Sequence, residues 1–157
     1  TMSKSLRRVR SVLEAAGLAA RIHETDDSSR TAAGAAAAVG CALDQIAKSI
    51  IFRGEESGHV VLFLTAGGNR VDPAKATEVA GQRLGKADAE LIRAETGFAI
   101  GGVAPVGHLR QIEAWLDPRL LDFDLVWAAA GTPRHVFATE PRALFAACGA
   151  TIAGFTA

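Results

Sequence analysis

The chain has no tyrosine, one methionine and two cysteines, and it carries no net charge at neutral pH. Cys41 and Cys148 are too few for a disulfide scaffold and lack metal-ligand spacing, so we expect two reduced thiols in a cytoplasmic protein. Seventeen Lys and Arg residues balance seventeen Asp and Glu residues. This balance excludes nucleic-acid binding by bulk positive charge, although it permits a local basic patch. No run of large apolar residues is long enough for a transmembrane helix.

The remaining composition is that of a globular domain. The 157 residues are 49% hydrophobic and 22% charged, which is too apolar for a disordered chain. This length suits one hydrophobic core better than two, so we expect a single free-standing domain over residues 1–157. The basic stretch 4–10 is not followed by an apolar segment, which argues against a secretory signal.

Hydrophobic periodicity and turn residues predict a mixture of helices and strands. Helices are expected over residues 3–16, 31–39, 73–80, 89–96 and 140–147, with a helical turn near 43–47. Strands are expected over residues 18–23, 50–53, 59–65, 112–116, 124–129, 134–138 and 150–153. Because strands outnumber βαβ units and two hairpins are indicated, we expect a mixed α/β domain with a largely antiparallel sheet.

Lys48 is the first residue whose type conflicts with its surroundings. If a strand begins near Ile46, the alternation of side chains places Ile46, Lys48, Ile50 and Phe52 on one face. A lysine in an apolar face must be paired, desolvated or functional. The alternative is a lysine whose amine reaches the edge of the sheet.

A glycine-rich segment runs from Gly101 to His108 and includes Gly102 and Pro105. Its backbone can approach a ligand closely, and its exposed N–H groups could hold a carbonyl oxygen or a developing oxyanion. The spacing matches neither a P-loop nor a dinucleotide-binding motif. The alternative is a tight turn between a helix and a strand.

The other polar residues give weaker indications. The four histidines occur singly, so they do not indicate a metal site, and no G-x-S-x-G motif marks a serine hydrolase. His108 and His135 could line a pocket or be ordinary surface or packing residues. The basic residues of the first helix form either a solvated face or a phosphate-contacting face; they are Lys4, Arg7, Arg8 and Arg10.

Several segments in a fixed order resemble the YbaK/prolyl-tRNA synthetase-associated domain family over about residues 20–155. The segments are 45–52, 69–72, 96–98, 101–108, 122–124 and 131–135. The resemblance implies a curved, mainly antiparallel and partly barrel-like sheet with flanking helices. It also implies a trans-editing enzyme that hydrolyses the ester of a mischarged aminoacyl-tRNA, most often tRNA for proline. No metal or organic cofactor is expected.

The resemblance assigns roles to individual residues. Lys48, Gly101 and Gly102 are the expected catalytic residues, and Lys48 would hold a phosphate, the carbonyl or the terminal ribose. The expected substrate-binding residues are Thr31, Ser49, Pro105, His108 and His135. The expected tRNA-binding residues are Lys4, Arg7, Arg8 and Arg10, with Arg21 as a further candidate.

The expected partner is the acceptor end of aminoacyl-tRNA. The specificity for one tRNA comes either from this chain's own reading of the acceptor end or from a prolyl-tRNA synthetase as a second partner. The ribose hydroxyl beside the ester would help to activate water. Two other functions stay open: a non-catalytic binding module of the same fold, and an enzyme that forms a Schiff base on Lys48.

Overall fold

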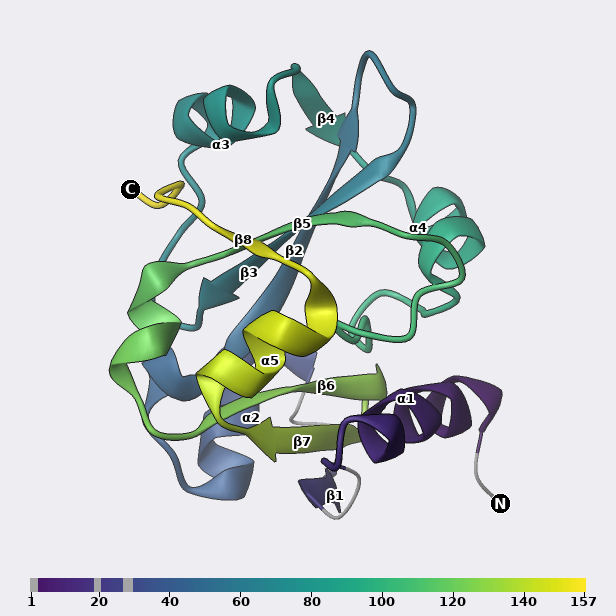
Figure 1. Cartoon of the computed structure of the whole chain (residues 1–157), viewed down its shortest axis with the longest axis vertical. Coiled ribbons are helices and arrows are strands. Elements are labelled where there is room, and N and C mark those ends of the chain that lie inside the picture. Colours follow the sequence, from purple (N-terminus) through teal and green to yellow (C-terminus); the bar gives the residue numbers. More distant parts are fainter. Residues whose placement is uncertain (1–2, 19–20, 27–29) are drawn as a thin grey trace.

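The structure is a computed structural model, and it describes residues 3–18, 21–26 and 30–157. The α-helices are α1 (Lys4–Ala15), α2 (Ala32–Val39), α3 (Pro73–Ala80), α4 (Ala89–Thr96) and α5 (Pro141–Cys148), with 3-10 helices η3 (Leu43–Gln45) and η4 (Pro118–Asp122). The strands are β1 (Ile22–Glu24), β2 (Ala47–Gly54), β3 (Val60–Ala66), β4 (Leu84–Lys86), β5 (Glu113–Leu116), β6 (Val126–Thr132), β7 (His135–Thr139) and β8 (Thr151–Ile152). Figure 1 shows α1 beside β6 and β7, and α3 beside β4 at the opposite end.

The strands form two sheets, with the orders β1-β7-β6 and β4-β2-β3-β5-β8. The smaller sheet is antiparallel, whereas in the larger one β5 runs parallel to both β3 and β8. A single parallel bridge between Ile46 and Trp127 connects them. The mixed α/β class and the predominance of antiparallel pairs are confirmed. The partly barrel-like single sheet is not confirmed, because β6 meets β2 only at this bridge.

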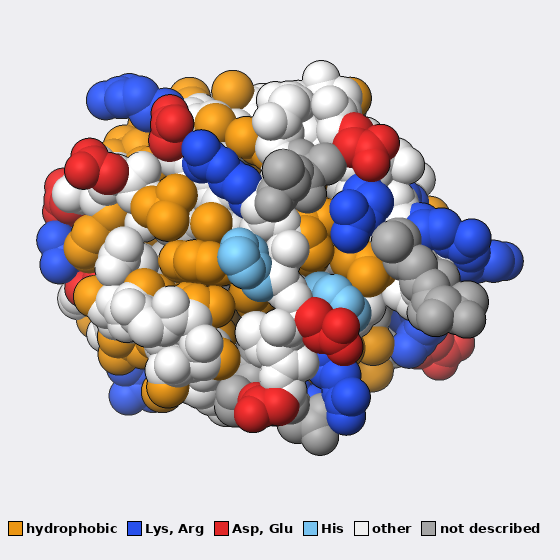
Figure 2. Space-filling model, turned by 90° about the horizontal axis from the view of Figure 1, so that it is seen from below, with side chains coloured by type: hydrophobic (Ala, Val, Ile, Leu, Met, Phe, Trp, Pro, Cys, Tyr) orange, Lys and Arg blue, Asp and Glu red, His pale blue; other side chains and the backbone are white. Residues whose placement is uncertain are grey.

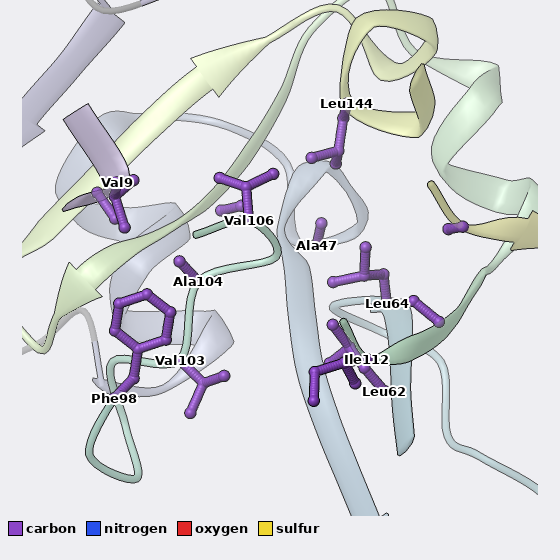
Figure 3. Packing of buried hydrophobic residues seen from close by; sticks show 14 of the residues in the cluster. Val9, Ala47, Leu62, Leu64, Phe98, Val103, Ala104, Val106, Ile112 and Leu144 are labelled. Carbon is purple, nitrogen blue, oxygen red and sulfur yellow. The ribbon is translucent and has the colours of Figure 1, made fainter. Parts of the chain in front are cut away.

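The larger sheet is covered on both faces. Every residue of β3 is buried, as its unbroken apolar sequence predicts for a central strand. Figure 3 shows one side of this core, where Leu62 and Leu64 of β3 lie near Ala47, Ile112 and other apolar residues. On the opposite face the stacked rings of Phe63 and Trp115, 4.9 Å apart, lie in a second cluster.

Local signals account for most helix boundaries. The Ser3 hydroxyl accepts a hydrogen bond from Leu6 N–H at the start of α1, and Asp88 caps α4 in the same way. Gly97 ends α4 in the left-handed conformation, which favours glycine. No helix of the described ranges is long and apolar enough to cross a membrane.

The strands differ more from their predicted bounds. β2 begins at Ala47, three residues before the predicted start, and β4 was not predicted at all. The predicted strand 18–23 includes residues 19–20, which lie outside the described residues, and β1 occupies Ile22–Glu24.

The buried carboxylate of Asp117 ties the end of β3 to η4. Its Oδ2 accepts hydrogen bonds from Ala66 N–H at 3.1 Å and from Asn69 Nδ2 at 2.9 Å, and its Oδ1 accepts one from Arg119 N–H at 3.0 Å. The side chain is 2% exposed. Since a buried carboxylate needs such partners, Asp117 organises the turn that follows β3.

We expect Asp117→Ala to lower the free energy of unfolding by about 3 kcal/mol, because it leaves buried donors without acceptors. Urea denaturation measures this change. The matched control is Asp122→Ala, which removes an exposed carboxylate paired with Arg119 and should cost at most about 1 kcal/mol. Equal effects of the two substitutions would contradict the assigned role of Asp117.

Candidate functional site

A cavity of about 530 Å³ lies where the two sheets meet. β2 and β6 line it together with α2 and the glycine-rich segment, and most of its lining is apolar. Six alanines contribute only small side chains to this lining: Ala32, Ala35, Ala47, Ala87, Ala128 and Ala129. Its size is within the range of about 300–1,000 Å³ that is typical of small-ligand pockets.

Lys48 lines this cavity and is half-buried. Its Nζ donates a hydrogen bond to the carbonyl oxygen of Gly67, at 3.2 Å. Burial lowers the pKa of the Lys48 ammonium, and the charge of Arg70 lowers it further, against the opposite effects of Asp44 and Asp117. Lys48 is therefore a partly desolvated amine with a defined hydrogen-bond partner.

The turn after β3 holds that partner in place. A side chain at Gly67 would clash with the carbonyl oxygen of Leu43, so only glycine permits this approach of η3. The next amide, Gly68 N–H, donates to Asp44 Oδ1 at 2.8 Å, and Arg119 Nε donates to Asp44 Oδ2 at 3.0 Å. The Lys48 acceptor thus belongs to a hydrogen-bonded turn.

Gly101 also lines the cavity, at the tip of a β-turn. Gly102 N–H donates to Ala99 carbonyl oxygen at 3.1 Å. Gly101 has a positive φ of 92°, whereas the φ of Ile100 is not positive. This pattern is that of a type II turn, which requires a residue such as glycine at its third position. The N–H of Gly101 makes no hydrogen bond to the described residues and can serve a ligand.

Gly102 has a different role from the one expected. A Cβ on Gly102 would lie 2.7 Å from the carbonyl carbon of Thr132 and 3.0 Å from Pro133 N. The residue is buried and does not line the cavity. The expectation of two free amides is therefore not met, because Gly102 N–H closes the turn and its missing side chain permits packing on the β6–β7 connection.

Three expected substrate-binding residues line the cavity: Thr31, Ser49 and His135. Each polar side chain already has a protein partner. The Thr31 hydroxyl caps α2, and the Ser49 hydroxyl donates to Val103 carbonyl oxygen at 2.9 Å. His135 Nδ1 lies 2.7 Å from the Thr132 hydroxyl. Their positions agree with the expectation, while their roles in substrate binding stay predictions.

Pro105 and His108 do not line this cavity. They line a smaller hollow of about 280 Å³ next to the end of α5. His108 Nε2 donates to Ala104 carbonyl oxygen at 2.7 Å, and burial lowers the pKa of its imidazole. His108 thus holds the Ala104 carbonyl of the glycine-rich segment, and Pro105 lines the same smaller hollow.

Arg8 corrects another expectation. Its Nε donates to Gly107 carbonyl oxygen at 2.6 Å, and its guanidinium carbon lies 4.7 Å from the centre of the Phe98 ring. A weaker hydrogen bond of 3.4 Å reaches Thr96 carbonyl oxygen. Arg8 therefore joins Gly107, near the end of the glycine-rich segment, to Thr96 and Phe98, which precede the segment, and it is not a free contact for tRNA.

The other basic residues of the first helix remain accessible. Lys4 and Arg7 are exposed, and Arg10 is half-buried; Arg21, beyond the helix, is exposed. Figure 2 shows Lys and Arg side chains at several places on the face seen from below, with acidic side chains among them. Lys4 and Arg7 therefore remain as exposed basic residues of α1, with Arg10 partly exposed, whereas Arg8 does not belong to this surface.

The sequence did not single out four of the lining residues: Arg30, Lys86, Ile100 and Trp127. Lys86 belongs to strand β4, which the sequence did not predict. Trp127 belongs to β6, and its backbone forms the bridge with Ile46 that brings β6 beside β2. Arg30 directly precedes Thr31, an expected substrate-binding residue, and this proximity is the one signal that could have found it. Both cations are exposed, so they can meet an anionic ligand.

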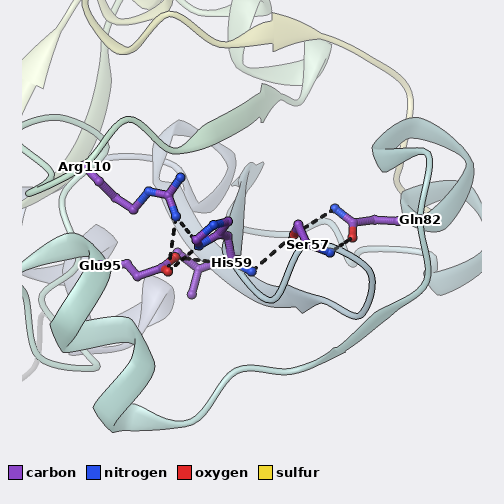
Figure 4. Close-up of polar contacts among 6 residues, drawn as sticks. Ser57, His59, Gln82, Glu95 and Arg110 are labelled. Atoms are coloured by element: carbon purple, nitrogen blue, oxygen red, sulfur yellow. Dashed lines mark hydrogen bonds and ion pairs between the residues drawn. The ribbon is translucent and has the colours of Figure 1, made fainter.

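A histidine–carboxylate–arginine cluster lies outside the cavity lining (Figure 4). Glu95 Oε2 is 2.7 Å from His59 Nδ1 and 3.3 Å from Arg110 Nη1, and Glu95 Oε1 accepts Val60 N–H. Burial alone would raise the pKa of Glu95, but the bonds from His59 and Val60 outweigh it and lower that pKa. The cluster fastens α4 to the start of β3. Among the described residues, no group of His, Cys, Asp and Glu could hold a metal ion.

A sequence profile described as an aminoacyl-tRNA editing domain matches residues 26–147. The chain belongs to that family. The uncharacterized protein YwhH of Bacillus subtilis (strain 168) is 33% identical over 123 residues, which is 78% of each chain.

Two solved structures are also similar. A candidate trans-editing enzyme for prolyl-tRNA synthetase has a TM-score of 0.91 and 46% identity, over 100% of this editing domain and 99% of that chain. A scaffold protein from computational epitope grafting has a TM-score of 0.89 and 43% identity, over 99% of each chain.

We expect Arg8→Ala to loosen the glycine-rich segment, because two backbone carbonyls and the Phe98 ring lose their partner. The free energy of unfolding should fall by about 2 kcal/mol, and amides 97–107 should exchange hydrogen faster in mass spectrometry. Arg7→Ala, on the exposed part of the same helix, is the control and should change neither quantity. An unchanged rate of amide hydrogen exchange in Arg8→Ala would show that the glycine-rich segment is ordered without Arg8.

Proposed function

We propose that this chain hydrolyses the ester of mischarged aminoacyl-tRNA, with tRNA for proline carrying a small non-cognate amino acid as the substrate. The observation that carries the proposal is that Lys48 and Gly101 both line one largely apolar cavity, and that Gly101 N–H has no hydrogen-bond partner among the described residues. An amine that is partly desolvated and a backbone donor are suited to hold an anionic or polarised group. Membership of the editing family supports the reaction class.

In the proposed reaction, water adds to the carbonyl carbon of the ester and the carbon–oxygen bond to the ribose breaks. The ribose oxygen takes a proton, and the products are a free amino acid and a tRNA with an intact terminal hydroxyl. Gly101 N–H would donate to the carbonyl oxygen while it gains negative charge. No carboxylate lines the cavity in the described residues, so a ribose hydroxyl beside the ester would help to orient the water.

Lys48 would fix the substrate beside this donor. In the structure its amine is hydrogen-bonded to the carbonyl oxygen of Gly67, which is not among the residues that line the cavity, so the amine would exchange that acceptor for a substrate oxygen. Holding the ester in one orientation is itself a large part of the acceleration that enzymes provide. We therefore assign Lys48 to positioning and charge stabilisation, with the terminal ribose or a phosphate as its contact.

The amino acid and the tRNA would be selected by different parts of the molecule. The alanines of the cavity wall leave room for a small side chain, but such a wall separates apolar amino acids differing by one methylene only about 10- to 200-fold. The similar structure that is linked to prolyl-tRNA synthetase supports tRNA for proline as the carrier. Arg30 and Lys86 at the cavity, with Lys4, Arg7 and Arg10 of α1, are the proposed contacts for the acceptor end.

We expect Lys48→Ala to reduce deacylation of alanyl-tRNA for proline by at least about 100-fold, because an oriented charge is lost from a desolvated site. Single-turnover assays with purified mischarged tRNA measure the rate. Thermal unfolding should change little, since Lys48 makes one hydrogen bond.

The comparison with other substrates separates the alternatives. A panel of alanyl-, cysteinyl-, seryl-, threonyl- and prolyl-tRNA should show fast hydrolysis of a small non-cognate ester and slow hydrolysis of the cognate one. A wild-type chain that binds these tRNAs without turnover would instead establish a non-catalytic binding module. Borohydride trapping of a carbonyl compound on Lys48 would favour Schiff-base chemistry.

We expect Arg30→Glu to raise KM for aminoacyl-tRNA about tenfold and to leave kcat near the wild-type value, because phosphate contacts supply affinity rather than chemistry. The salt dependence of KM should also weaken. Arg142→Glu on α5, exposed and outside the cavity, is the matched charge reversal and should alter neither parameter. An equal KM effect from both variants would indicate bulk charge rather than a local contact.

A further inference from the structure

The backbone N–H and C=O groups of successive β2 residues point alternately to the two edges of the strand. Gly54 N–H donates to His59 carbonyl oxygen at 2.9 Å, so this pair is hydrogen-bonded across the β2–β3 ladder. In an antiparallel ladder the N–H and C=O of one residue point to the same neighbour, and the next residue points to the opposite one. Residues 48, 50 and 52 therefore face β3, while Ser49 and its odd-numbered neighbours face the other edge. Glu55 N–H agrees, because it donates to Arg83 carbonyl oxygen.

That other edge is only partly occupied. β4 pairs with β2 at Phe52, Arg53 and Gly54, and β6 meets β2 at Ile46 alone. Ser49 lies between these two contacts, and no strand of the described ranges pairs with it there. The residues 46–51 all line the cavity, so the gap in the sheet and the cavity are the same space.

A main-chain donor and acceptor at such a gap require a partner. Buried or half-buried backbone groups are almost always hydrogen-bonded, and an open strand edge is a template for another extended segment. The Ser49 side chain does not fill the gap, since its hydroxyl is bonded to Val103 carbonyl oxygen. What Ser49 offers to a ligand is therefore its main chain.

We propose that Ser49 binds the main-chain atoms of the aminoacyl group as one rung of a β-sheet. This inference rests on the proposed function and names the substrate class of that site: esters of α-amino acids. Ser49 carbonyl oxygen accepts a hydrogen bond from the α-ammonium, and Ser49 N–H donates to the carbonyl oxygen of the ester. These are the two bonds that residues of an antiparallel hydrogen-bonded pair exchange.

This arrangement gives two properties to the site. Every α-amino acid carries the same donor and acceptor, so recognition of the acyl group does not depend on its side chain, which is left to the cavity walls. Ser49 N–H also becomes a second donor to the oxygen that gains charge when water adds. It takes the place that the sequence had suggested for Gly102.

Amide hydrogen exchange tests the binding step without turnover. In the free protein the Ser49 amide should exchange fast and the Ile50 amide, bonded to β3, slowly. The probe is 3′-alanylamino-3′-deoxyadenosine, an amide that the reaction does not cleave, and it should slow Ser49 exchange at least tenfold. The propionyl analogue, which lacks the α-amino group, should bind at least tenfold more weakly. Slow Ser49 exchange in the free protein, or binding that leaves it unchanged, would overturn the inference.

Substitution tests the catalytic step. Ser49→Pro removes the N–H, and the strand should tolerate it because this N–H is not part of the β2–β3 ladder. We expect kcat for alanyl-tRNA to fall about 100-fold, with a much smaller loss in Ser49→Ala, which removes only the hydroxyl. Equal losses in the two variants would refute the main-chain role. If Ser49→Pro does not fold, the exchange experiment decides alone.

Different results would contradict the proposed function and the role of Ser49. A wild-type chain without activity on any mischarged tRNA would remove the proposed function, whereas the exchange of Ser49 would still report whether the edge takes an aminoacyl group. An active wild-type chain in which the alanylamino probe leaves Ser49 unaffected would keep the proposed function and remove the inference.

Discussion

The open stretch in the sheet beside β2 is the constraint on which the site depends. β3 pairs with β2 over Ala47 to Arg53, whereas β4 joins the other edge only from Phe52. If β4 were longer, its backbone would fill the space that the cavity occupies. The gap leaves hydrogen-bonding groups of the main chain beside apolar walls, and such groups are strong ligands once water is excluded.

The glycine-rich segment opposite this edge is held by side chains from several elements. Arg8 of α1, Ser49 of β2 and His108 each bind one or more of its carbonyl oxygens. With those carbonyls held and Gly102 packed against the β6–β7 connection, Gly101 and Val103 are the residues of the segment that line the cavity. If Gly101 N–H is the donor that we propose, it is in position before the substrate arrives, which lowers the cost of orienting it during the reaction.

Much of the local structure could be predicted from the sequence because its causes are local. Ser3 and Asp88 cap helices, Gly97 ends one, and the apolar run of β3 marks a central strand. β4 could not be predicted: Leu84, Gly85 and Lys86 have no strand pattern of their own, and they are extended because they pair with β2. The division into two sheets is likewise a matter of long-range pairing, which the order of strands along the chain does not specify.

The sequence by itself determined the order of most elements and indicated the family, and through that resemblance it singled out Lys48 and the two glycines as candidates. Only the tertiary structure decided what these residues do. Gly101 and Gly102 are adjacent and chemically identical, yet one faces the cavity and the other closes a turn. Arg7 and Arg8 are also adjacent, yet one is exposed and the other holds a segment about a hundred residues away. The reason is physical: a side chain's type sets which bonds it can form, and packing decides which partner is within reach.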